Sequence, residues 1–155
     1  RQMCIRDRNK RLKMTENNTE ESADTWQLCG KTLHSRLLLG TGGMTSIDIM
    51  EKSLVASGAE VATVAMRRHA KTGVDIYGML QRHNINVLPN TAGCKTAHDA
   101  VLTAKMARES LGTDWIKLEV IADDDTLLPD TREVLLAAEK LIEEGFSVLC
   151  YTNDV

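Results

Sequence analysis

Short apolar runs alternate with amphipathic segments along most of the chain from Trp26 onward. Runs rich in Val, Leu and Ile are typical of buried strands, whereas apolar residues three or four positions apart are typical of one helix face. The pattern predicts strands at residues 36–41, 60–66, 86–91, 115–121 and 146–152. It predicts helices at residues 46–57, 75–83, 95–110 and 131–144, and a small N-terminal hairpin around Gly30.

A helix between each pair of successive strands predicts an α/β fold with a parallel sheet. Right-handed crossovers then leave two main architectures, an open doubly wound sheet or a closed barrel, and the alternation alone does not choose between them. The sequence stops just after the last expected strand, which leaves that strand without a covering helix. We therefore expect residues 25–155 to be the N-terminal part of a larger domain.

The first 24 residues differ from the rest of the chain. Residues 1–14 are basic without periodicity, and residues 15–24, TENNTEESAD, are polar and acidic. A segment without an apolar face buries too little surface to offset the entropy lost on ordering. We expect residues 1–24 to form a disordered tail that is partly non-native in sequence; the alternative is a basic arm that binds a partner.

Composition and charge narrow the classes of partner. The net charge is −3 and aromatic residues make up 3% of the chain, so neither a basic surface nor a stacking platform for nucleic acid is expected. No apolar run approaches the roughly 20 residues that cross a bilayer. The four cysteines lack C-x-x-C spacing and fit reduced thiols. We expect a cytoplasmic protein with no membrane or nucleic-acid partner and no resident metal or cofactor.

The segment from Ile116 to Val120, IKLEV, carries the most informative chemistry. Strand side chains alternate between faces, so Lys117 and Glu119 should share one face and the apolar residues the other. Two charges on one face are unexpected in an inner parallel strand. A lysine beside a carboxylate suits imine formation with a carbonyl substrate, because the carboxylate can move protons once the imine exists. The alternative is a half-exposed edge strand with both charges in solvent.

Two glycine-rich turns and a second lysine are weaker candidates. Residues 40–43 and 91–94 follow strands, where backbone amides can hold phosphate. Neither turn matches a phosphate-loop motif, so tight-turn geometry is favoured. Lys95 is the rival lysine for imine formation, but it begins a helix and has no carboxylate fixed beside it.

The remaining charged clusters are more typical of solvated surface. The pair Arg67-Arg68 follows the second strand of the expected sheet and could bind an anion there. The run Asp123-Asp124-Asp125 could ligate a hard cation, but consecutive side chains point in different directions. We expect both to be solvated.

Several blocks of the sequence resemble a known family. In order and with matching spacing, residues 26–155 resemble thiazole synthase of thiamine biosynthesis; residues 1–24 do not. The blocks are SRLLLGTGG (35–43), VATVAMRR (61–68), VLPNTAG (87–93), KTAHDAVLTAKMARESLGTDWIKLEV (95–120) and LLPDTREVLLAAEKLIEEGFSVLCYTND (127–154).

The resemblance implies a (β/α)8 TIM barrel, incomplete here with about five strands and four helices after a short hairpin. The family condenses 1-deoxy-D-xylulose 5-phosphate, dehydroglycine and the thiocarboxylate of a small ubiquitin-like sulfur carrier into the thiazole phosphate of thiamine. Its imine-forming lysine lies in a K-x-E strand motif. That motif maps onto Lys117 as the Schiff-base lysine and Glu119 as the carboxylate that transfers protons.

Partners and limits follow from the same resemblance. It implies a sulfur-incorporating transferase, with the sulfur carrier and a dehydroglycine-producing enzyme as partners, in a homo-oligomer. The phosphate-binding loops that such barrels place after strands seven and eight have no counterpart in this chain, so we expect it to be inactive alone. The alternatives are an inactive fragment of that enzyme and another Schiff-base barrel that acts on a sugar phosphate.

Overall fold

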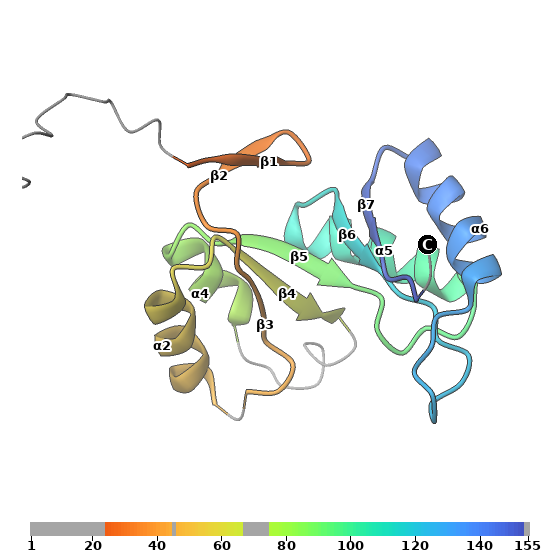
Figure 1. Cartoon of the computed structure of the whole chain (residues 1–155), viewed down its shortest axis with the longest axis horizontal. Coiled ribbons are helices and arrows are strands. Elements are labelled where there is room, and N and C mark those ends of the chain that lie inside the picture. Colours follow the sequence, from red (N-terminus) through yellow and green to blue (C-terminus); the bar gives the residue numbers. More distant parts are fainter. Residues whose placement is uncertain (1–23, 45, 67–74, 154–155) are drawn as a thin grey trace, which may run out of the picture.

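The computed structural model describes residues 24–44, 46–66 and 75–153, which form a small hairpin and a five-stranded parallel sheet (Figure 1). In the hairpin, β1 (Trp26–Leu28) pairs antiparallel with β2 (Lys31–Leu33). The strands of the larger sheet lie side by side in chain order. They are β3 (Leu38–Gly40), β4 (Val61–Ala65), β5 (Asn86–Asn90), β6 (Trp115–Leu118) and β7 (Ser147–Cys150).

A helix connects each pair of successive strands in this sheet. The helices are α2 (Ile47–Ser57), α4 (Ile76–Arg82), α5 (Ala97–Leu111) and α6 (Thr131–Glu143). Polar side chains cap their amino ends, as Thr96 does when its hydroxyl accepts a hydrogen bond from the Asp99 amide. Gly58 and Gly112 end α2 and α5 in the left-handed conformation, where glycine has no Cβ penalty.

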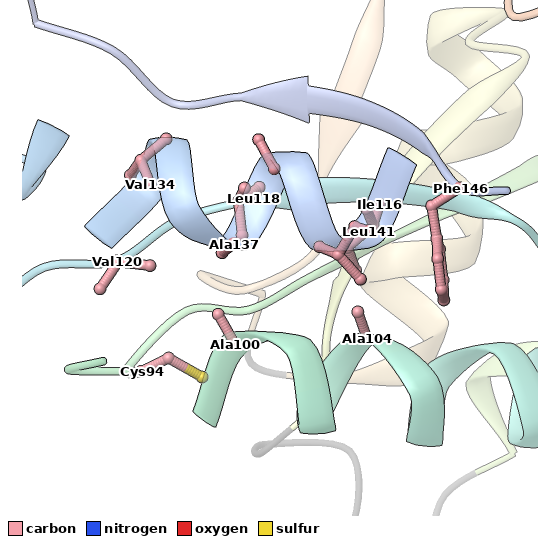
Figure 2. Close-up of a cluster of buried hydrophobic side chains, with 11 residues drawn as sticks. Cys94, Ala100, Ala104, Ile116, Leu118, Val120, Val134, Ala137, Leu141 and Phe146 are labelled. Carbon is pink, nitrogen blue, oxygen red and sulfur yellow. The ribbon is translucent and has the colours of Figure 1, made fainter. Parts of the chain in front are cut away.

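The four helices cover one face of the sheet. Figure 2 shows Ile116, Leu118 and Val120 packed against α5 and α6, and all three are fully buried. Ala62, Val64 and Val87 of β4 and β5 pack in the same way against α2 and α4. Apolar residues of strands and helices therefore form the main core, although Ile47 and Val55, which the helical spacing placed on the apolar face of α2, are 37% and 57% exposed.

The hairpin covers part of the opposite face, toward the amino-terminal ends of the strands. Leu33 packs there with Val61, Leu88 and Trp115, which alternate along their strands with the helix-facing residues. The ammonium of Lys31 lies 5.2 Å from the centre of a Trp115 ring, and this cation–π contact helps to hold the hairpin against the sheet. The carboxyl end of this face lies beyond the hairpin cluster and carries Lys117.

The expected (β/α)8 barrel is wrong for this structure. In the sheet order β3-β4-β5-β6-β7, β3 and β7 are separate edges, and no strand of the described residues joins them. Alternating strands and helices determine a parallel sheet, whereas closure requires the first and last strands to pair with consistent tilt and register. The α/β class, the hairpin, the five strands and the four helices are all present among the described residues.

Two expectations fall on residues that lie outside the described part of the chain. The first is the disordered tail at residues 1–24, of which the structure describes only Asp24. The second is the anion-binding candidate Arg67-Arg68. Within the described ranges, no helix is long and apolar enough to cross a membrane.

Candidate active site

Lys117 and Glu119 lie together on the sheet face that the helices leave uncovered. Lys117 is flanked across the sheet by Asn90 of β5 and Leu149 of β7. Its side chain points away from Ile116, which is buried in the helix-side core. The Lys117 Nζ atom is 3.0 Å from the Glu119 Oε1 atom, and the two side chains are 38% and 12% exposed. Strand alternation predicted this pairing.

Glu119 lies one residue beyond β6, so strand pairing alone does not hold it. The hydroxyl of Thr91 accepts a hydrogen bond from the Glu119 amide at 2.8 Å and donates one to the Glu119 carbonyl at 2.7 Å. The Thr91 amide also donates to the Lys117 carbonyl at 3.2 Å. These bonds continue the attachment of this segment to β5 after the regular strand has ended.

Tyr151 borders the lysine on the other side. The centre of its ring is 5.9 Å from the Lys117 Nζ atom, within cation–π range. Its amide donates to the Leu118 carbonyl at 2.8 Å, and its hydroxyl donates to the Leu127 carbonyl at 3.3 Å. The sequence reasoning did not select Tyr151. Leu149 is the partner of Lys117 in β7, and strand alternation puts Tyr151, two residues further on, on the same side of the sheet. The sequence therefore did contain a signal for Tyr151.

This arrangement can support amine chemistry on a small carbonyl compound. The Lys117 amine is partly exposed, so a ligand can reach it from the uncovered face. The neighbouring carboxylate stabilises the protonated amine and can accept its proton when the neutral amine attacks a carbonyl carbon.

The rival lysine, Lys95, also has a carboxylate partner, contrary to the expectation from the sequence. Lys95 forms an ion pair with Asp124 at the surface, where its side chain is 42% exposed. The adjacent Asp123 carboxylate accepts hydrogen bonds from the Asp125 amide and the Thr126 hydroxyl, each at 2.9 Å. These bonds lower the pKa of Asp123, and they are formed within the loop itself. Among the described residues, no three His, Cys, Asp or Glu side chains are grouped as a metal site would require.

The two glycine-rich turns have the tight geometry that the sequence favoured. The Met44 amide donates to the Thr41 carbonyl at 3.4 Å, and the Cys94 amide donates to the Thr91 carbonyl at 3.0 Å. In the first turn, the Thr41 hydroxyl donates to the Thr63 carbonyl of β4 at 2.7 Å. Each turn therefore begins with a threonine that binds the backbone of the next strand.

Comparisons with known proteins support the observed fold and show the family. A chain of the crystal structure of the Amycolatopsis orientalis BexX/CysO complex matches with a TM-score of 0.67 at 23% sequence identity. The match covers 81% of this chain and 52% of that one, so this chain spans about half the length of the matched structure; at such identity the likeness concerns the fold alone. Residues 27–155 match the sequence model described as "Thiazole biosynthesis protein ThiG". The chain therefore belongs to the thiazole biosynthesis protein ThiG family.

Proposed function

We propose that the full-length gene product is a thiazole synthase of thiamine biosynthesis and that Lys117 forms an imine with its carbonyl substrate. The observation that carries the proposal is the 3.0 Å pair of Lys117 and Glu119 on the uncovered face of a ThiG-family chain. A paired lysine on a half-open surface is accessible to a ligand, and its carboxylate partner supplies a proton acceptor at the same place.

The proposed substrate of the first step is 1-deoxy-D-xylulose 5-phosphate. The neutral Lys117 amine adds to the ketone carbon, and the carbonyl oxygen becomes the hydroxyl of a carbinolamine. Glu119 carries one proton from the amine to the oxygen to give that hydroxyl, and then carries the second amine proton to the hydroxyl, which leaves as water while the carbon–nitrogen double bond forms. Atoms and charge balance over the step, which needs no oxidant or reductant.

Dehydroglycine and a sulfur-carrier thiocarboxylate are the proposed co-substrates, so a dehydroglycine-producing enzyme and a small ubiquitin-like protein are the proposed partners. Membership of the ThiG family supports this assignment. The matched relative was crystallised as a complex of BexX with CysO, which supports a protein partner for the fold.

Turnover by residues 1–155 alone is not expected. Among the described residues, Lys117 contacts the Glu119 carboxylate and the Tyr151 ring, neither of which binds a phosphate group. The proposal assigns no phosphate-binding group to these contacts. The experiments below use the full-length product for this reason.

Reductive trapping tests the proposal directly. Borohydride converts an imine into a stable secondary amine, so incubation with 1-deoxy-D-xylulose 5-phosphate should attach the sugar phosphate to Lys117, as peptide mass spectrometry would show. A Lys117→Ala variant should lose the label, whereas a Lys95→Ala variant, which removes the ion pair with Asp124, should keep it. Undiminished labelling of the Lys117→Ala variant would contradict the assignment.

A further inference from the structure

The hydroxyl of Thr91 is fully buried and makes both of its strong hydrogen bonds to one residue. It accepts from the Glu119 amide and donates to the Glu119 carbonyl. A buried hydroxyl with both roles satisfied inside the protein holds its partner in a defined position, because water is not available to replace either bond. The partner here is the carboxylate-bearing residue beside Lys117.

Strand pairing is sparse where these bonds occur. Five pairs of residues are in register between β4 and β5, but between β5 and β6 only Asn90 and Lys117 are. Beyond that pair, the attachment consists of the Thr91 amide bond to the Lys117 carbonyl, the two Thr91 hydroxyl bonds to Glu119 and, two residues further on, the Ile121 amide bond to the Cys94 carbonyl. The amide and the carbonyl of Glu119 itself both bond to Thr91. The direction in which the Glu119 side chain leaves the backbone thus depends on Thr91.

We propose that Thr91 is a positioning residue, whose hydroxyl fixes the end of β6 so that the Glu119 carboxylate stays beside the Lys117 amine. The inference rests on the proposed function for its effect on catalysis, since it assigns to Thr91 the geometry that the proton transfer needs. Misplacing a reacting group by about 1 Å can slow a reaction on the order of a hundredfold. Loss of the hydroxyl should therefore slow imine formation more than substrate binding.

The chain supplies a matched control in Thr41. This residue also begins a turn after a parallel strand, is almost fully buried, and donates its hydroxyl to a carbonyl of the next strand, that of Thr63. Its bond lies on β4, and no residue of the Lys117 pair contacts it. Removing either threonine hydroxyl breaks the same type of buried bond, but only one of them touches Glu119.

The test compares Thr91→Val, Thr91→Ser and Thr41→Val in the full-length protein. Hydrogen exchange at the Glu119 amide reports the bond directly, and the rate of borohydride-trapped imine at Lys117 reports its consequence. In Thr91→Val we expect exchange on the order of tenfold faster and trapping about ten to a hundred times slower, with KM little changed. Thr91→Ser keeps the hydroxyl, so its Glu119 exchange rate and its trapping rate should be close to those of the unsubstituted protein. Thr41→Val should change neither rate.

Several results would overturn the inference. One is unchanged Glu119 exchange in Thr91→Val, and another is equal slowing of trapping in Thr41→Val, which would mean that any lost buried bond has the same effect. If Thr91→Val does not fold, Thr91→Ala removes the hydroxyl without the extra methyl groups and takes its place. If the unsubstituted protein is not labelled, the proposed function fails, and exchange at Glu119 alone decides whether Thr91 positions this segment.

Discussion

The Glu119 carboxylate lies 3.0 Å from the Lys117 amine although β6 ends at Leu118, between the two residues. The pair therefore does not result from strand geometry alone. Lys117 is held by its neighbours in the sheet, whereas Glu119 is held by a side chain from the turn after β5. Two adjacent parallel strands thus supply the pair, one with the two charged side chains and the other with the bonds that hold Glu119.

Glu119→Gln should slow both imine formation and the later proton transfers. The amide keeps the shape of the side chain and its ability to hydrogen-bond, but it does not accept a proton at neutral pH. We expect the rate of trapping at Lys117 to fall at least as much as in Thr91→Val, and thiazole formation to fall by about 10²- to 10⁴-fold, the usual contribution of a general acid–base group. Steady-state product formation and mass-spectrometric trapping measure the two effects. Full turnover by the variant would remove Glu119 from the mechanism.

Glu60 should make folding stability depend on acid pH. Its Oε2 atom accepts hydrogen bonds from the Ser35 amide at 2.8 Å and the His34 amide at 2.5 Å, and these bonds lower its pKa below the usual 4.5. A lowered pKa in the folded state means that the stabilisation is present above the unfolded value and is lost as pH falls through the folded value. We therefore expect Glu60→Gln to lower the melting temperature at pH 7 and to have little effect well below pH 4.5.

A Glu139→Gln variant is the control for the Glu60 measurement. Glu139 is exposed on α6, so removal of its charge should leave the melting temperature nearly unchanged at both pH values. Thermal unfolding followed by circular dichroism gives both curves. If the melting temperature of Glu60→Gln differed from that of the wild type by the same amount at pH 7 and at acid pH, the two amide bonds would not favour the charged carboxyl.

Hydrophobic spacing was enough to predict the elements but not their closure. Apolar residues in strands and helices had distinct periods, which located each element to within a few residues. Whether strands at the two ends of a parallel sheet pair is decided by tilt, register and strand number, which no local pattern carries. The expectation of a barrel came from the family resemblance, and the open order of the five strands overturned it.

Only those residues of the candidate site that lie close together in the sequence could be predicted. Lys117 and Glu119 are two residues apart, so period-two alternation was enough to place them on one face. Thr91 and Tyr151 lie 28 residues before Glu119 and 34 residues after Lys117, and their contacts depend on strand order. Alternation could have put Tyr151 on the same face, but no local pattern distinguishes a threonine that binds a neighbouring strand from one that only turns the chain.

Two leucines of α6 should differ sharply in their contribution to stability. Leu141 is fully buried in the cluster between α5, α6 and β6, whereas Leu135 is 60% exposed on the same helix. We expect Leu141→Ala to lower the free energy of unfolding by about 2–5 kcal/mol, because a cavity replaces the side chain. Leu135→Ala should change it by less than about 0.5 kcal/mol. Urea denaturation of both variants measures the difference, and equal effects would contradict the packing of α6.

The stability of the protein should fall even when Arg108 is replaced by lysine. The centre of its guanidinium lies 3.4 Å from the centre of the Phe146 ring, and its Nη2 atom donates to the Glu144 carbonyl at 3.0 Å. Arg108 thereby links α5 to the segment that connects α6 with β7. Lysine keeps the charge but lacks the planar group that stacks on the ring, so Arg108→Lys should lower the free energy of unfolding by about 1–2 kcal/mol.

Arg132→Lys provides the comparison for this last substitution. Arg132 is exposed in the first turn of α6, where an arginine and a lysine side chain are equally well solvated, so we expect a change within about 0.5 kcal/mol. Urea titrations at low and high salt separate the contributions, because stacking on Phe146 persists when salt screens exposed charges. If the Arg108→Lys loss disappeared at high salt, the ion pair of Arg108 with Asp114 at 2.7 Å and not the planar contact with Phe146 would account for it.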